Sequence, residues 1–264
     1  MKVWCDCPRG HRAGRSIDRF GQPRLQFAAW RFPLYTLAVR ERFYSDFVWQ
    51  MMHAALESRT NEIYRHLVAG DEAACRRYID RIRSEDGVSV LTVCEQLTEA
   101  FHSIGDAWAC SEISVYREHV ASQIGCRLLL DLSSSLTAVS ETASTAIGCT
   151  PESDPYSLPT LMVELVMREL GWNATSLGTN LPLELLAPAM EDLRPDLCWV
   201  SVSYTDSPAR LRQQLECLGD TGRADQIRIL CGGQAITNEL RQGISDITFV
   251  DDLCDLAMIS PTSS

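Results

Sequence analysis

The first half of the chain has the hydrophobic pattern of packed helices. Between residue 43 and about residue 136, apolar side chains recur at intervals of three and four, which is the period of an amphipathic helix. Short polar breaks at 70–71, 86–87 and 109–111 interrupt this pattern. Because short connections join antiparallel neighbours, the pattern predicts a bundle of about four helices.

The second half alternates between strands and helices. A polar run, "SSSLTAVSETAST", comes first, and the period of the apolar positions changes after it. Such alternation predicts right-handed crossovers and a five-stranded parallel sheet covered on both faces, a flavodoxin-like or Rossmann-like domain. Sheets of this kind bind ligands at the carboxyl ends of their strands. The predicted strands are 145–149, 173–177, 197–203, 227–231 and 247–250, and the predicted helices are about 158–170, 183–193, 208–218 and 234–242.

Three regions follow from these patterns. We expect a leader over 1–42, a helical bundle over 43–140 and an α/β domain over 141–264. The leader has nine basic and three acidic residues, which is compatible with a short arm for a phosphate-bearing partner. Its prolines, its glycines and its lack of apolar periodicity favour an extended leader with no domain, and no helix-turn-helix pattern for reading DNA is visible in it.

Composition narrows the class of protein. The chain has 264 residues, of which 45% are hydrophobic, and its formal net charge of −11 gives no electrostatic footprint for nucleic acid. Its eleven cysteines show neither a zinc-ribbon spacing nor a disulfide framework. No apolar segment approaches the roughly 18 residues of a membrane span. We therefore expect a cytoplasmic protein that binds neither DNA nor a membrane.

The segment "DAWACSEISVYREHVAS", residues 106–122, has an unusual arrangement of side chains. Ser111 is a favoured N-cap residue, so we expect a helix from Glu112 to about Leu132. The packed side of that helix is expected to carry Ile113, Tyr116, Val120 and Ile124. The opposite side has mostly small residues beside Glu118 and His119.

Trp108 ends the preceding helix and can overhang the side of Glu118 and His119. Together these three side chains can cover one face of a flat ligand. From the residues alone, the opposite interpretation stays open: a tryptophan at a helix end is often part of the core, and a Glu-His pair is often a solvated edge.

A helical bundle with this Trp and Glu-His pair, followed by an α/β domain, resembles the cobalamin-binding module of light-sensing transcriptional regulators of the CarH type. The resemblance covers roughly residues 45–258. It implies that Trp108, Glu118 and His119 contact the upper face of a cobalamin, where the adenosyl group lies, and that the α/β domain holds the lower face and the nucleotide tail.

The α/β half carries further parts of the resemblance. "GWNATSLGTNLP" is similar to the family's second strand and turn, Ser201 and Ser203 occupy its Ser-x-Ser/Thr position, and Gly232 and Gly233 its double glycine beside the nucleotide tail. Hydroxyls at a strand end can bind a tail, and glycines allow close backbone approach. Serines there also cap helices, and paired glycines also form turns, so these residues alone decide nothing.

The chain departs from the family's lower-face motif, which is an acid, any residue, a histidine, two residues and a glycine. The matching positions hold Asp154, Tyr156 and Pro159. The cobalt-binding histidine is therefore absent, and a phenol with a pKa of about 10 is a poor replacement. Pro159 is bulkier than glycine and narrows the route of a displaced nucleotide tail. Ala109 also stands where some of these light sensors have a second histidine, and the family's N-terminal DNA-binding domain is not recognisable.

These observations predict a non-enzymatic sensor or regulatory protein that holds cobalamin between its helical and α/β halves. The alternatives are a corrinoid methyl carrier of a methyltransferase system, or a degenerate module that binds another tetrapyrrole or no cofactor. For haem, His102 and His119 are the candidate iron ligands; otherwise no metal site is predicted. We expect a protein partner or a homo-oligomer. No phosphate loop, dinucleotide fingerprint, nucleophile elbow or pair of metal-spaced histidines suggests another chemistry.

Overall fold

The computed structural model describes residues 61–140, 142–259 and 261. The chain forms two compact units, one containing the described part of Met1–Tyr78 with Gln96–Ile124, the other Ile79–Glu95 with the described part of Gly125–Ser264. The expected leader over 1–42 lies outside the described residues. The expected boundary between 140 and 141 stays a prediction, because the division into units cuts across the helices instead.

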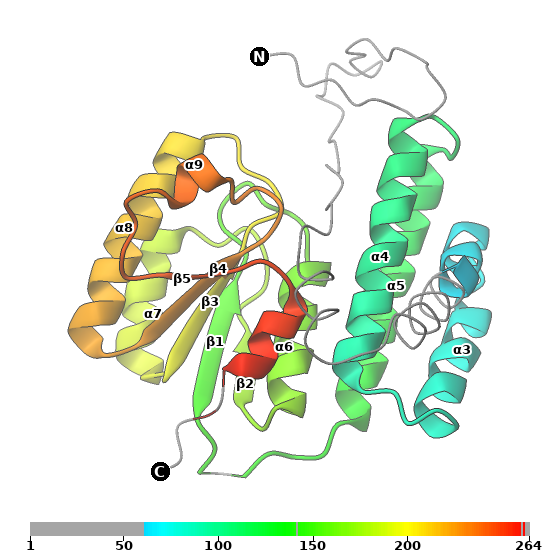
Figure 1. Cartoon of the computed structure of the whole chain (residues 1–264), viewed down its shortest axis with the longest axis horizontal. Coiled ribbons are helices and arrows are strands. Elements are labelled where there is room, and N and C mark those ends of the chain that lie inside the picture. The colour runs from blue at the N-terminus through cyan, green and yellow to red at the C-terminus, as the bar shows by residue number, and fades with distance from the viewer. Residues whose placement is uncertain (1–60, 141, 260, 262–264) are drawn as a thin grey trace, which may run out of the picture. The chain divides into compact units, whose positions relative to one another are not determined.

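The helical half has four helical segments within the described residues, as the apolar period predicts. They are residues 61–69, α3 (Glu72–Ser84), α4 (Val90–Ala109) and α5 (Val115–Ser135) (Figure 1). The predicted break at Gly70 is confirmed: this residue has a φ of 74°, which favours glycine, and its N–H bonds to the Leu67 carbonyl at 3.0 Å. Asp71 then begins α3, since its carboxylate accepts the Ala74 N–H at 2.9 Å. Among the helices described, none is both long and apolar enough to span a membrane.

The second half forms a five-stranded, all-parallel sheet, which confirms the predicted fold class. The strand order is β2-β1-β3-β4-β5. The chain therefore passes from β1 to one neighbour, β2, and then returns to the other side of β1 to form β3. The strands are β1 (Thr145–Cys149), β2 (Asn173–Ser176), β3 (Leu197–Ser201), β4 (Arg228–Gly232) and β5 (Thr248–Val250).

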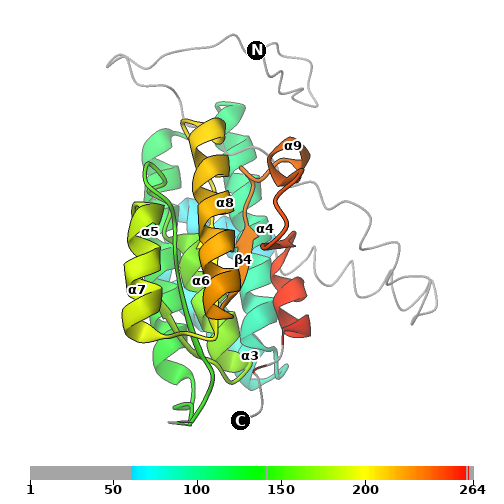
Figure 2. The same ribbon diagram turned by 90° about the vertical axis from the view of Figure 1, so that its left-hand side faces the viewer.

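Helices cover both faces of this sheet (Figure 1). The pleat points alternate side chains of β1 and β3 to opposite faces. Ile147, Cys149, Cys198 and Val200 belong to one buried cluster with residues of α7 (Leu186–Leu193) and α8 (Pro208–Asp225), two helices that Figure 2 shows side by side. The other face packs against α6 (Leu158–Glu169). The remaining short elements are η1 (Leu183–Leu185) before α7, α9 (Asn238–Arg241) and η2 (Leu253–Met258) at the end.

Two predicted helix bounds in this half are wrong. The α8 helix continues about two turns past residue 218, because Leu218, Gly219 and Gly222 are buried although the local sequence is polar. A Cβ at Gly222 would lie 2.5 Å from Ile229 Cγ1, so the glycine is needed for close packing on β4. In contrast, α9 is only the short segment Asn238–Arg241, because the residues before it form the turn after β4.

The predicted N-cap of the helix that carries Glu118 is also wrong. Ser111 has a φ of 60° and its N–H bonds to the Trp108 carbonyl, while the Glu112 N–H bonds to the Ala107 carbonyl. This pair of bonds is the Schellman pattern that ends a helix, so Ser111 closes α4. The next helix begins three residues later than expected, at Val115.

The buried face of α5 is the reverse of the predicted one in its first turns. Tyr116 is 61% and Val120 43% exposed, whereas Glu118 and Ala121 are buried. Ile124, the last residue of the predicted packed side, is buried as predicted, and burial continues at Gly125, Leu128 and Leu132. The prediction weighted hydrophobicity and neglected size: small residues allow close packing, and the leucines later in the helix set which face is inside.

Candidate functional site

The carboxyl ends of β1 and β3 form the topological switch point of the sheet, since the strand order reverses between them. In open α/β sheets this is where ligands bind. The loops that follow these strands, 150–157 and 202–207, carry three of the six predicted α/β site residues: Asp154, Tyr156 and Ser203. The structure brings these two loops together through Asp154.

Asp154 is fully buried and is bonded entirely to backbone. Its Oδ2 accepts the N–H groups of Ser203 at 2.6 Å and Tyr204 at 3.2 Å, and its Oδ1 accepts that of Tyr156 at 3.1 Å. Burial raises the pKa of Asp154, and the three N–H groups, which favour the ionised form, offset this only in part. The carboxylate therefore clamps the β1–α6 loop to the β3–α8 loop.

Tyr156 and Pro159 stand where the resemblance expects a histidine and a glycine. Tyr156 is half-buried, and its N–H is the donor to Asp154. Pro159 lies in the first turn of α6, where its missing N–H costs little. Ser157, the N-cap residue, has its Oγ 3.2 Å from the Cys126 sulfur. The β1–α6 loop itself contains no histidine.

The double glycine is required by the fold. A Cβ at Gly232 would lie 2.7 Å from the Val250 carbonyl oxygen, and one at Gly233 only 2.2 Å from that of Val202. Gly233 also has a φ of 116°. Both glycines thus allow neighbouring protein backbone to approach, which explains them without any ligand.

Ser201 and Gln234 add polar groups to the same edge of the sheet. Ser201, the last residue of β3, is buried and pairs in register with Gly232. Gln234 donates through Nε2 to the Ser203 carbonyl at 3.1 Å, while its Oε1 is buried and has no hydrogen-bond partner within the described part of the chain. A buried acceptor without a partner is costly, so Gln234 offers a position for a ligand N–H.

Sequence reasoning missed Trp199, a buried residue in the middle of β3. It pairs in register with Gly148 of β1. Its indole Nε1 donates to the Thr160 hydroxyl of α6 at 3.1 Å, so the ring lies on the α6 face of the sheet. A tryptophan within a predicted buried strand was a visible signal, but the partner on the neighbouring strand could not be identified from the sequence.

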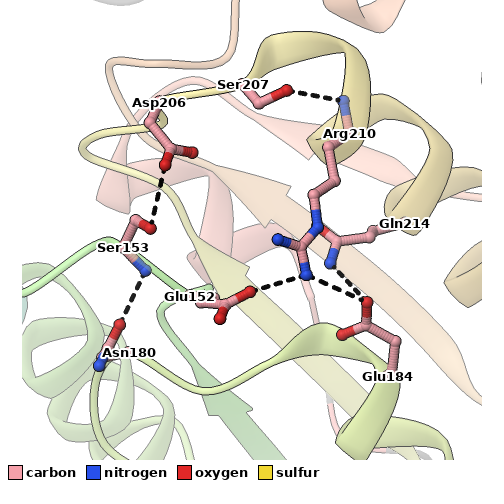
Figure 3. A network of polar contacts seen from close by, with 8 residues as sticks. All are labelled: Glu152, Ser153, Asn180, Glu184, Asp206, Ser207, Arg210 and Gln214. Atoms are coloured by element: carbon pink, nitrogen blue, oxygen red, sulfur yellow. Dashed lines mark hydrogen bonds and ion pairs between the residues drawn. The ribbon is translucent and has the colours of Figure 1, made fainter.

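An exposed polar network joins the loops around the switch point (Figure 3). Arg210 forms ion pairs with Glu152 at 2.7 Å and Glu184 at 3.6 Å, and the Ser153 hydroxyl donates to Asp206 at 3.3 Å. All three members of the ion-paired group are about half exposed, so water screens these contacts. The network links the loops at the surface, and the charged groups of its ion pairs are all exposed to solvent.

In the helical unit, the three predicted residues have different environments. Trp108 is half-buried in the last turn of α4. The Glu118 side chain is 12% exposed and accepts the Ser122 hydroxyl at 2.9 Å, whereas the side chain of His119 is 75% exposed. The His119 Nδ1 lies 3.8 Å from Glu118 Oε2. Ala109, at the position of the second histidine, ends α4.

His102, the other candidate iron ligand, lies in α4. Burial lowers its pKa from 6.5 to about 4, so this imidazole is neutral at physiological pH. Within the described ranges, no group of three or more histidine, cysteine or acidic side chains is arranged to hold a metal ion.

Comparisons with known proteins confirm the resemblance to a cobalamin-binding module. Residues 60–128 match the family model of the B12 binding domain. Over 128 residues the chain is 29% identical to the HTH-type transcriptional repressor CarH of Myxococcus xanthus, a match that covers 46% of this chain and 42% of that protein. The alignment thus spans about two fifths of the length of the curated relative.

The fold is similar to that of the monomethylamine corrinoid protein of Methanosarcina barkeri. The superposition has a TM-score of 0.63, with 15% sequence identity, and covers 77% of this chain and 97% of the archaeal one. At this identity the comparison establishes the shared fold of a helical region followed by a parallel α/β domain.

Proposed function

We propose that this chain is a non-enzymatic sensor that binds a corrinoid, with cobalamin as the expected cofactor. One observation carries the proposal: the segment that matches the B12 binding domain, 60–128, contains Trp108, Glu118 and His119 at the spacing of the light-sensing regulators. The HTH-type transcriptional repressor CarH of Myxococcus xanthus is a relative over part of the chain, which supports regulation as the role.

The residues of the chain suit the ring of a corrinoid. The half-buried indole of Trp108 can pack on a flat ligand, and the exposed His119 beside Glu118 can meet its upper axial group. In the α/β unit, Gln234 Oε1 can accept a hydrogen bond from one of the amides at the corrin periphery. When bound, the corrinoid supplies a cobalt centre whose upper bond is sensitive to light.

The chain does not suit lower ligation by a protein histidine. Tyr156 stands at the ligand position, and Asp154, the acid of the family's motif, accepts three backbone N–H groups. We therefore expect the cobalt to keep its own base or to have water or nothing below. Electron paramagnetic resonance of the cobalt(II) form should show no nitrogen splitting that depends on isotopic labelling of protein histidine; such splitting would refute this point.

The cofactor itself is tested by the visible spectrum of protein purified from a host supplied with cobalamin. We expect a corrinoid spectrum, and Trp108→Ala should weaken binding at least tenfold. Tyr156→Phe is the matched control, with an expected change below about twofold, since it removes only a hydroxyl at the lower position. A protein that takes up no corrinoid in any form overturns the proposal and favours a module without cofactor.

A corrinoid methyl carrier is the second candidate, favoured by the shared fold with the Methanosarcina barkeri corrinoid protein. The two functions differ in what the bound cofactor does. A sensor should change its oligomeric state or its hold on a partner when illuminated, as seen by size-exclusion chromatography in dark and light. A carrier should instead pass a methyl group from methylcobalamin to a thiol acceptor when a methyltransferase is present.

The sensor is expected to act through a protein partner or a second copy, without binding DNA or a membrane. The chain carries a net charge of −11, which opposes binding to polyanions. In an electrophoretic mobility assay we expect no sequence-dependent shift by the protein alone. A shift that persists at high salt and depends on sequence would contradict this expectation.

A further inference from the structure

The α/β unit contains an indole in the space below its ligand-binding edge. Trp199 of β3 is 2% exposed and lies beside Gly148 of β1. A Cβ built on Gly148 would fall 2.0 Å from Trp199 Cδ2 and 2.2 Å from Cε2, inside the ring's own volume. Gly148 is therefore the residue whose missing side chain makes room for the indole.

Hydrogen bonds hold this indole against α6 and β2. Its Nε1 donates to Thr160 Oγ1 at 3.1 Å, and Thr160 Oγ1 lies 3.0 Å from Ser176 Oγ, at the end of β2. The N–H of Ser176 in turn donates to Glu164 of α6 at 3.0 Å. The ring thus has partners on α6 and, through Thr160, on β2, which makes its position well determined.

The indole lies directly beneath the predicted tail-binding position. Trp199 and Ser201 are two residues apart in one strand, so both side chains lie on the α6 face, about 7 Å apart along the strand. Ser201 is the upper of the two, at the carboxyl end. A group that enters between β3 and α6 past Ser201 therefore meets the indole ring.

We propose that Trp199 occupies the place that a displaced nucleotide base would need, so that this chain binds corrinoids without using their nucleotide tail. The base of cobalamin, a benzimidazole, and the indole are both fused six- and five-membered rings of similar size. The chain should accept an incomplete corrinoid that lacks the nucleotide, or a cobalamin whose base stays on cobalt. This inference rests on the proposed function and adds the class of corrinoid.

The unmodified protein gives the first test, by titration with aquocobalamin and with aquocobinamide, which lacks the nucleotide. We expect dissociation constants within threefold of each other, and bound cobalamin should keep its base-on spectrum. Cobalamin binding at least tenfold tighter than cobinamide, or a base-off spectrum, overturns the inference and leaves the proposed function intact. Binding of neither corrinoid overturns the proposed function, and the inference with it.

A cavity test checks the same space without any corrinoid. The Trp199→Ala variant should bind free 5,6-dimethylbenzimidazole. This binding should raise the melting temperature of the variant by several degrees, whereas the wild type should show no such rise. With cobalamin, this variant should shift toward the base-off spectrum. Trp172→Ala is the matched control, because Trp172 is also fully buried but donates to the Ile259 carbonyl elsewhere in the unit. A base-off shift in Trp172→Ala as well, or in neither variant, counts against the inference.

Discussion

Two regions carry the predicted site residues, and they differ in what holds each residue in place. At the carboxyl edge of the sheet, the fold itself explains the residues: Asp154 bonds three backbone N–H groups, and Gly232 and Gly233 make room for neighbouring backbone. In the helical segment, His119 projects into solvent. Residue types typical of a cofactor family can therefore persist for structural reasons, so the helical residues are the better indicators of ligand binding.

The largest expected loss of stability comes from a substitution that disrupts the packing beneath the sheet edge. Gly148→Ala places a methyl group inside the volume of the Trp199 ring, so the ring or the strand must move. We expect a loss of about 3 kcal/mol in the free energy of unfolding, measured by urea denaturation. Gly219→Ala in α8 is the control, since its nearest neighbours lie 3.4 Å away, and it should change stability by less than about 1 kcal/mol.

The double variant Gly148→Ala with Trp199→Phe sharpens the same test. If the methyl group and the indole compete for one space, the smaller ring should recover part of the loss, so that the double variant loses less than the sum of the single variants. Strict additivity would show that the two side chains do not share this space.

The second effect concerns the clamp between the two loops. Asp154→Asn replaces two acceptor oxygens by one and leaves at least one buried N–H without its partner, so we expect a loss of about 2 kcal/mol. Asp206→Asn is the control, because that exposed carboxylate accepts one bond, from Ser153, and it should cost less than about 0.5 kcal/mol. If the two variants were equally stable, the three hydrogen bonds of Asp154 would not be what stabilises these loops.

The α/β fold could be predicted from the sequence because its strands and helices alternate within short windows, as at 145–149 and 158–169. The face of α5 could not, because apolar content placed Tyr116 inside although packing is decided by Ala121 and Leu128. The role of Trp199 was equally hidden, since its partner Gly148 is 51 residues away and is identified only by the register of β1 with β3. The periodicity of apolar residues along the sequence contains no information on long-range strand pairing or on side-chain size.

The third effect is the response of the helical half to pH. His102 has a pKa lowered from 6.5 to about 4 by burial, so between these values the unfolded chain binds a proton that the folded chain does not. Stability should therefore fall as the pH drops from about 6.5 toward 4, by up to about 2 kcal/mol at pH 4.5. His102→Gln should flatten this part of the profile, measured as the difference between variant and wild type; an unchanged profile would mean that His102 is solvated.

The smallest expected effect on stability decides most about the helical residues. His119 has an exposed side chain whose recorded contact is a 3.8 Å approach to Glu118, so His119→Ala should alter the free energy of unfolding by less than about 0.5 kcal/mol. The same variant should weaken cobalamin binding at least tenfold if the imidazole meets the upper axial group. Measured together, the two values separate a ligand-binding residue from a structural one. A loss of stability above about 1 kcal/mol with unchanged binding would show that His119, like Asp154, stabilises the fold and does not bind the ligand.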